Sequence, residues 1–134
     1  MERLKQRLDI ASKALETLHD VVGHDDVSAL VRDAAIQRFQ YSFEATWKAM
    51  QRYLQVQEGI QPGSPKSVIR AAHQTGLLND EQGRSALRMV DDRNLTVHTY
   101  NEALASQIYT RLQGYYALMN AAVSNMQSAI KAAP

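Results

Sequence analysis

The chain has 134 residues, of which 45% are hydrophobic and 22% are charged, with a formal net charge of +1 and no cysteine. The length predicts a single domain over residues 1–134, and the absence of cysteine excludes disulfides and thiolate metal sites. The near-neutral charge gives no global basic field, so any contact with nucleic acid is expected to be local. Because the sequence contains neither an apolar run of roughly 18 residues nor a signal peptide, we expect a cytoplasmic protein without membrane contact.

Apolar residues spaced three and four apart predict helices along nearly the whole chain. The first helix covers about residues 4–22 and ends at Gly23. Residues 24–26 then form a turn and cap a long second helix over about residues 27–57, and glycine and proline break the pattern in a loop at residues 58–64. The residues expected to face the core are Leu4, Leu8, Ala11, Leu15, Leu18, Val22, Ile36, Phe39, Phe43, Trp47, Met50 and Leu54.

Three further helices are predicted after the loop. Residues 64–75 predict a short helix, because a serine followed by proline is a common helix start and Gly76 ends the pattern. Asn79 caps a fourth helix that extends towards Val97, and Asn101 begins a long fifth helix. The inward residues of the fifth helix are Leu104, Ile108, Leu112, Tyr115, Met119, Ala122 and Met126. The sequence therefore predicts an all-α fold, an antiparallel up-and-down four-helix bundle with one short extra helix.

Polar and aromatic residues gather where the fourth helix should end. Arg93, Asn94, His98 and Tyr100 lie within eight residues. The apolar face, extended from Leu87 and Val90, places Asn94 on a surface that should pack, with Arg93 at its flank. Buried polar groups require partners, so this segment is a candidate functional site.

A purely structural interpretation of these residues remains open at this point. Arg93 has three acidic residues as candidate ion-pair partners, namely Asp91, Asp92 and Glu44. His98 would then lie at the C-terminal end of the helix, where a positive charge is favourable to the helix dipole.

The residues do not predict a metal or cofactor site. His19, His24, Asp25 and Asp26 resemble metal ligands, but histidines five apart do not share a helical face, and the acidic pair is needed for capping. The sequence also lacks a glycine-rich phosphate-binding loop. We expect no metal and no cofactor.

The sequence RNLTVHTY, from Arg93 to Tyr100, resembles the Arg-x4-His-x-Tyr signature of HEPN domains that are paired with minimal nucleotidyltransferases. The likeness covers roughly residues 3–125. It includes segments similar to the nucleotidyltransferase substrate-binding branch of this group, at residues 32–54, 64–78 and 93–109. The resemblance implies a helical bundle, in agreement with the spacing of apolar residues.

The resemblance also implies a toxin–antitoxin pair. The helical protein would be a metal-independent ribonuclease, neutralised by a cognate minimal nucleotidyltransferase. Arg93 and His98 would be catalytic, the first binding phosphate and the second transferring a proton to or from RNA. Asn94 would position the phosphate or the backbone. Tyr100 would be the residue to which the nucleotidyltransferase adds AMP.

Geometry and family both favour a homodimer. Residues five apart on an α-helix point roughly 140° from each other, so Arg93 and His98 converge poorly on one helix. The conflict eases if the helix ends before His98, or if two chains face each other across a two-fold axis, as in dimers of this family. Two other functions remain open, a non-catalytic substrate-binding subunit of a two-component nucleotidyltransferase and a structural helical adaptor.

Overall fold

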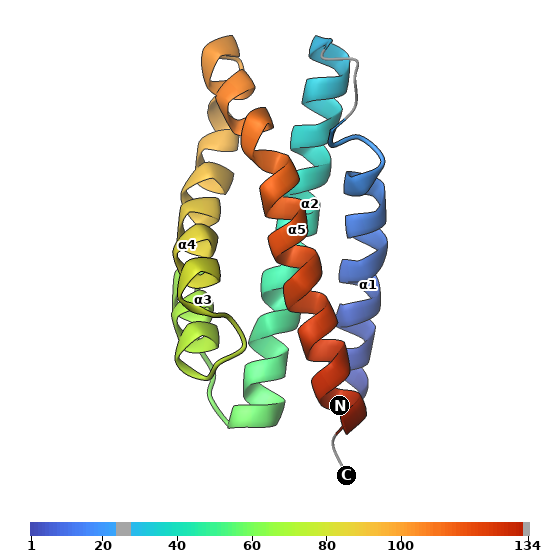
Figure 1. Ribbon diagram of the computed structural model, residues 1–134, viewed down its shortest axis with the longest axis vertical. Helices are drawn as coiled ribbons and strands as arrows, with labels where there is room; N and C mark the ends of the chain where they lie inside the picture. The colour runs from blue at the N-terminus through green and yellow to red at the C-terminus, as the bar shows by residue number, and fades with distance from the viewer. Residues whose placement is uncertain (24–27, 133–134) are drawn as a thin grey trace.

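The computed structural model describes residues 1–23 and 28–132, and these residues are almost entirely helical (Figure 1). The elements are α1 (Glu2–His19), α2 (Ala29–Glu58), α3 (Pro65–Gln74), α4 (Asp80–Leu95), the 3-10 helix η1 (Thr96–His98) and α5 (Glu102–Ala132). The described ranges contain no strand, and none of their helices is long and apolar enough to cross a bilayer. The all-α prediction is confirmed.

The four long helices form an up-and-down bundle. The α2 and α5 helices run side by side in the centre, with α1 packed against both on one side (Figure 1). The short α3 and the longer α4 form a hairpin that packs on the other side. This arrangement brings the C-terminal end of α4, η1 and the start of α5 together at one end of the bundle.

Side-chain caps begin three of the helices where the sequence predicts them. Ser64, Asn79 and Asn101 each accept a hydrogen bond from the backbone N–H three residues later, at 3.3, 2.8 and 3.2 Å. At Ser64 and Asn79 the residue three positions on returns a bond to the cap, which completes a capping box. These caps satisfy backbone donors that have no partner within the helix.

The boundary between the first two helices differs from the prediction. The first helix ends at His19 rather than at Gly23, which lies in the following turn with a φ of 70°. Ser28 is the N-cap of α2, and its Oγ accepts a bond from the N–H of Val31 at 3.3 Å. The turn and cap predicted at residues 24–26 lie outside the described residues.

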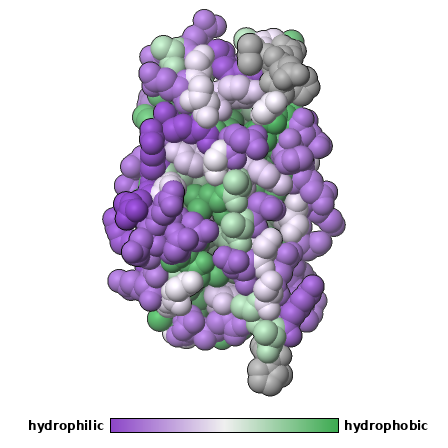
Figure 2. Space-filling model, viewed as in Figure 1, coloured by the Kyte–Doolittle hydropathy of each residue, from purple (hydrophilic) through white to green (hydrophobic). Residues whose placement is uncertain are grey.

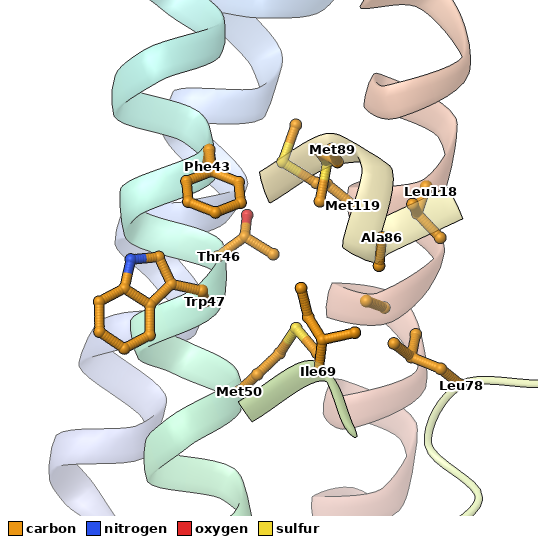
Figure 3. A pocket seen from close by; sticks show the side chains of 11 residues that line it. Phe43, Thr46, Trp47, Met50, Ile69, Leu78, Ala86, Met89, Leu118 and Met119 are labelled. Atoms are coloured by element: carbon orange, nitrogen blue, oxygen red, sulfur yellow. The ribbon is translucent and has the colours of Figure 1, made fainter. Parts of the chain in front are cut away.

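Most of the apolar residues predicted to face inward form one continuous core, but four of them are only partly buried, namely Val22, Trp47, Leu87 and Leu104. Val22 follows the end of α1, and Trp47 reaches the surface, where its indole N–H donates to Glu44 Oε2 at 3.1 Å. A void of about 10 Å³ lies among α2, α3, α4 and α5, next to Phe43 and Thr46 (Figure 3). That volume is about the size of one water molecule, so this part of the core is closed to ligands.

Asp92 ties the end of α4 to α5. Its side chain is buried, and Nε and Nη2 of Arg111 donate to its two carboxylate oxygens at 2.6 and 2.9 Å. The Tyr115 hydroxyl donates to Oδ2 at 2.5 Å. Burial alone would raise the pKa of Asp92, but these bonds and the charges of Arg111 and Arg88 hold it below its ordinary value. Burial and the bond to Asp92 raise the pKa of the Tyr115 phenol.

Replacing Asp92 with asparagine should lower the free energy of unfolding at pH 7 by about 2–3 kcal/mol, because charge-assisted bonds to a buried carboxylate are lost. Asp91→Asn is the matched control. It removes an exposed ion pair with Lys66 at 2.8 Å and should cost less than about 1 kcal/mol. Urea unfolding of the two variants measures the difference.

The same experiment has an expected pH dependence. The pKa of Asp92 is lower in the folded protein than in the unfolded chain, so its stabilisation is present above a pH of about 3.9 and is lost as the pH falls through the folded value. The gap between the wild type and Asp92→Asn should therefore narrow in acid. A gap that is independent of pH, or equal losses at both positions, would contradict this assignment.

Candidate functional site at the end of α4

The α4 helix ends before His98, and the hydroxyls of Thr96 and Thr99 form hydrogen bonds that favour this ending. The backbone N–H and the hydroxyl of Thr96 both donate to the carbonyl of Arg93, the hydroxyl at 2.6 Å. The Thr99 hydroxyl donates to the carbonyl of Thr96 at 3.1 Å. Bonds to a carbonyl three residues earlier compete with α-helical bonds and favour the tighter 3-10 turn. As a result His98 lies on η1, after the α-helix has ended at Leu95.

Towards its C-terminal end, α4 buries other residues than those predicted, although Val90 is buried as expected. Ala86 and Met89 are buried, and Thr96 is 4% exposed, whereas Val97 is 66% exposed. Asn94, which the apolar spacing also places on the packing face, is exposed. The prediction for these two residues is therefore wrong. The reason is that the inward turn of Asp92 towards α5, described above, fixes the rotation of the last turns of α4.

Arg93 is half-buried and has no ion pair among the described residues. Its Nε is buried and has no hydrogen-bond partner there. Each acidic side chain considered as its partner is engaged elsewhere: Asp91 with Lys66, Asp92 with Arg111, and Glu44 with Lys48 and Trp47. The ion pairs that a purely structural role of Arg93 would require are therefore not present among the described residues.

The charge of Arg93 nevertheless reaches α2. Partial burial acts to raise the pKa of Glu44, but bonds from Trp47 and Lys48, together with the charges of Lys48 and Arg93, lower it overall. Arg93 therefore lies on the side of α4 that faces α2.

Gln40, one helical turn before Glu44 on α2, contacts the same segment directly. Its Nε2 donates to Oγ1 of Thr96 at 2.8 Å. Gln40 is not among the residues predicted from the sequence, because the spacing of apolar residues along α2 does not single out a polar residue. The sequence offered one indication: Gln40 directly follows Phe39, which faces the core, so its amide lies near buried surface and needs a hydrogen-bond partner.

His98 and Tyr100 lie together on the surface. His98 is exposed and Tyr100 is 82% exposed. His98 Nδ1 and the Tyr100 hydroxyl are 3.2 Å apart, within hydrogen-bonding distance. Their rings are nearly perpendicular, with centroids 5.8 Å apart. The segment therefore presents an imidazole and a phenol to solvent as one unit.

Arg93 and His98 do not meet within one chain. No hydrogen bond or ion pair joins them in the part of the chain that the structure describes. Counting residue rotations through the end of α4 and along η1 still leaves them roughly 160° apart. The helix does end before His98, which was one of the two arrangements considered, but this ending alone does not bring the two side chains together.

The other candidate ligands add no site within the described ranges. Of the four residues that resemble metal ligands, only His19 is described, and residues 24–26 lie outside those ranges. Among residues 1–23 and 28–132, no three histidine or acidic side chains are grouped in a way that would hold a metal ion.

The surface over α4 and α5 carries charges of both signs. A shallow open groove between these helices is lined by Glu81, Arg88 and Arg111, among others. Figure 2 shows this side of the molecule as mostly hydrophilic, with an apolar hollow near its middle.

A helical bundle with arginine, histidine and tyrosine at the junction of α4 and α5 is the arrangement expected from the resemblance to HEPN domains. Residues 6–128 match the sequence profile described as "Nucleotidyltransferase substrate binding protein like". The chain belongs to this family, which confirms the membership predicted from residues 93–100.

Known relatives agree with this assignment. The probable ribonuclease HepT of Haemophilus influenzae is 34% identical over 86 residues, which cover 60% of this chain and 57% of that protein. The match thus spans little more than half of that relative. A Thermus thermophilus protein of known crystal structure is 55% identical, with a TM-score of 0.85 over 87% of this chain and 98% of its own.

A third relative shares the fold at low sequence identity. It is the tri-AMPylated HEPN toxin of Shewanella oneidensis, solved in complex with the MNT antitoxin. It is 16% identical, with a TM-score of 0.76 over 93% of this chain and 96% of its own.

Proposed function

We propose that this protein is the toxin of a toxin–antitoxin pair, a metal-independent endoribonuclease that a cognate minimal nucleotidyltransferase neutralises by adding AMP to Tyr100. The observation that carries the proposal is the exposed contact between His98 and Tyr100, five and seven residues after an arginine without an ion-pair partner among the described residues. The names of the Haemophilus and Shewanella relatives support the same activity and the same modification.

The chemistry requires few protein groups, because RNA carries its own nucleophile. In the proposed reaction the 2′-oxygen attacks the adjacent phosphorus, the bond to the 5′-oxygen breaks, and a 2′,3′-cyclic phosphate forms. His98 takes the proton from the 2′-hydroxyl or gives one to the departing 5′-oxygen. Arg93 stabilises the charge on the phosphate oxygens through its planar guanidinium. Asn94, exposed beside Arg93, positions the phosphate or the RNA backbone.

The proposed modification acts on the oxygen that contacts the imidazole. Transfer of AMP from ATP joins the Tyr100 oxygen to the α-phosphorus and releases pyrophosphate, and the phenol loses its proton. The modified oxygen has no hydrogen left to donate to His98 Nδ1, 3.2 Å away in the unmodified protein. The added phosphate also brings negative charge to the place where the RNA phosphate binds, so it competes for Arg93.

The proposed active form is a two-fold dimer in which Arg93 of one chain faces His98 of the other. Two observations support this arrangement. Arg93 faces α2 within its own chain and does not contact His98 there. Leu95 and Val97, within the motif segment, are 39% and 66% exposed, and a partner chain would bury them.

A non-catalytic role is the second candidate. The matching profile describes a nucleotidyltransferase substrate-binding protein, and the net charge of +1 suits a subunit that presents a substrate to a partner enzyme. In that case Arg93 would bind an anionic group of the substrate, and Tyr100 would be an exposed junction residue without modification.

Ribonuclease activity is tested with purified, unmodified protein. It should cleave single-stranded RNA in the presence of EDTA and leave DNA and 2′-O-methyl RNA intact. His98→Ala and Arg93→Ala should each lower the rate at least roughly 100-fold, because proton transfer or charge stabilisation is lost. His19→Ala and Arg84→Ala, which remove exposed side chains outside the motif, are the matched controls. Intact RNA with the wild type would favour the substrate-binding role.

Regulation is tested by intact-mass spectrometry after co-expression with the neighbouring nucleotidyltransferase. The wild type should gain one or more AMP units and lose ribonuclease activity. Tyr100→Phe should gain none and remain active, because the acceptor oxygen is gone. Tyr41→Phe is the control, since it removes another exposed phenol, on α2. A tight complex without any mass increment would argue against the regulated toxin.

The composite site is tested by mixing two inactive variants. In a heterodimer of Arg93→Ala and His98→Ala, one of the two sites regains both intact residues if the site spans the interface. Random exchange of subunits should then restore about a quarter of wild-type activity. No recovery after verified subunit exchange, or a strict monomer by light scattering at micromolar concentration, would exclude the shared site.

A further inference from the structure

We infer that Gln40 and Thr96 are positioning residues, which hold the turn that carries His98 at a fixed place relative to Arg93. The inference rests on the proposed function, because the reaction it serves is RNA cleavage. Neither residue belongs to the Arg–His–Tyr motif as defined by its sequence signature. They come from different helices, and the hydrogen bond between them links α2 to η1.

The contacts of Thr96 carry the inference. Its hydroxyl donates to the carbonyl of Arg93 at 2.6 Å and accepts from Nε2 of Gln40 at 2.8 Å. One hydroxyl thus connects the backbone of the first motif residue to a side chain of α2. Thr96 is 4% exposed, so water does not compete for these bonds.

The position of Gln40 on α2 directs its side chain towards the C-terminal end of α4. It lies on the half-buried edge of α2, one turn before Glu44, whose pKa responds to the charge of Arg93. The amide of Gln40 and the carboxylate of Glu44 therefore face the same end of α4. Among the described residues, no other side-chain hydrogen bond joins α2 to η1.

The turn's other hydrogen bonds are local to the segment: the Thr99 hydroxyl donates to the carbonyl of Thr96, and the N–H of Asn101 donates to the carbonyl of His98. Val97 and His98 are exposed, and the backbone leaves the α-helix at Leu95. Rate depends steeply on the position of a proton-transfer group, and a displacement of about 1 Å can lower it on the order of 100-fold. Without the bond to Gln40, Thr96 would still close the 3-10 turn, but the turn would no longer be fixed to α2.

The test uses variants whose side chains keep nearly the same size and shape but lack one hydrogen-bonding group. Thr96→Val and Gln40→Met should each lower kcat for single-stranded RNA roughly 10- to 100-fold, with KM changed less than about threefold, because substrate binding is retained. Thr96→Ser keeps the hydroxyl and should remain within about threefold of the wild type. The double variant should be no slower than the slower single variant, because both remove the same bond.

Thr110→Val is the matched control. The Thr110 hydroxyl also donates to a carbonyl three residues earlier, at 2.6 Å, but it connects no second element. Its removal should leave kcat unchanged. Melting temperatures of all variants, measured together, show whether a lost rate reflects lost folding.

Amide hydrogen exchange of residues 97–101, without RNA, gives a second readout. Exchange should be faster in Thr96→Val and Gln40→Met and unchanged in Thr96→Ser and Thr110→Val. If the wild type cleaves RNA and Thr96→Val matches it in kcat and exchange, the inference is overturned while the proposed function stands. If the wild type does not cleave RNA, the proposed function fails, and exchange alone decides: faster exchange in Gln40→Met, which removes only the bond to α2, supports the link, and unchanged exchange overturns it.

Discussion

The inward carboxylate of Asp92 is the constraint on which the geometry of the motif depends. Arg111 and Tyr115 of α5 hold it from two directions, and so fix how far the last turn of α4 can rotate. Successive residues of an α-helix are turned by about 100°, so with Asp92 facing α5 the next residue, Arg93, is directed towards α2. Thr96, three residues further on, shares that side and meets Gln40 there.

The two halves of the candidate site therefore have different surroundings. Arg93 is half-buried between helices, where a permanent charge acts through less water and interacts more strongly. His98 is exposed, where an imidazole exchanges protons with solvent easily. Under the proposed function, the group that holds charge occupies the half-buried position, and the group that exchanges a proton occupies the exposed one. This division suits phosphate chemistry on a flexible RNA strand.

The sequence is informative where the relevant residues are close together along the chain. Helix periodicity and caps such as Asn79 are local, and the motif itself occupies eight consecutive residues, so these features were recognisable. The rotation of α4 was not, because Asp92 is set by Arg111, which is 19 residues away. The bond between Gln40 and Thr96 spans 56 residues. Contacts of this kind depend on how the helices pack, and no local pattern of apolar residues contains that information.

The α3–α4 hairpin is a local unit of the fold, and Arg93 lies on it. Its helices are joined near both ends by polar contacts, an ion pair between Lys66 and Asp91 at 2.8 Å and a hydrogen bond between His73 Nε2 and Asp80 Oδ1 at 2.6 Å. A local unit of this kind can detach from the rest of a fold with a free energy smaller than that of global unfolding. Arg93 belongs to the hairpin, whereas the groups it faces on α2 do not. Opening of this hairpin would separate Arg93 from the groups it faces on α2, so a ligand that binds both sides of that boundary favours the closed form.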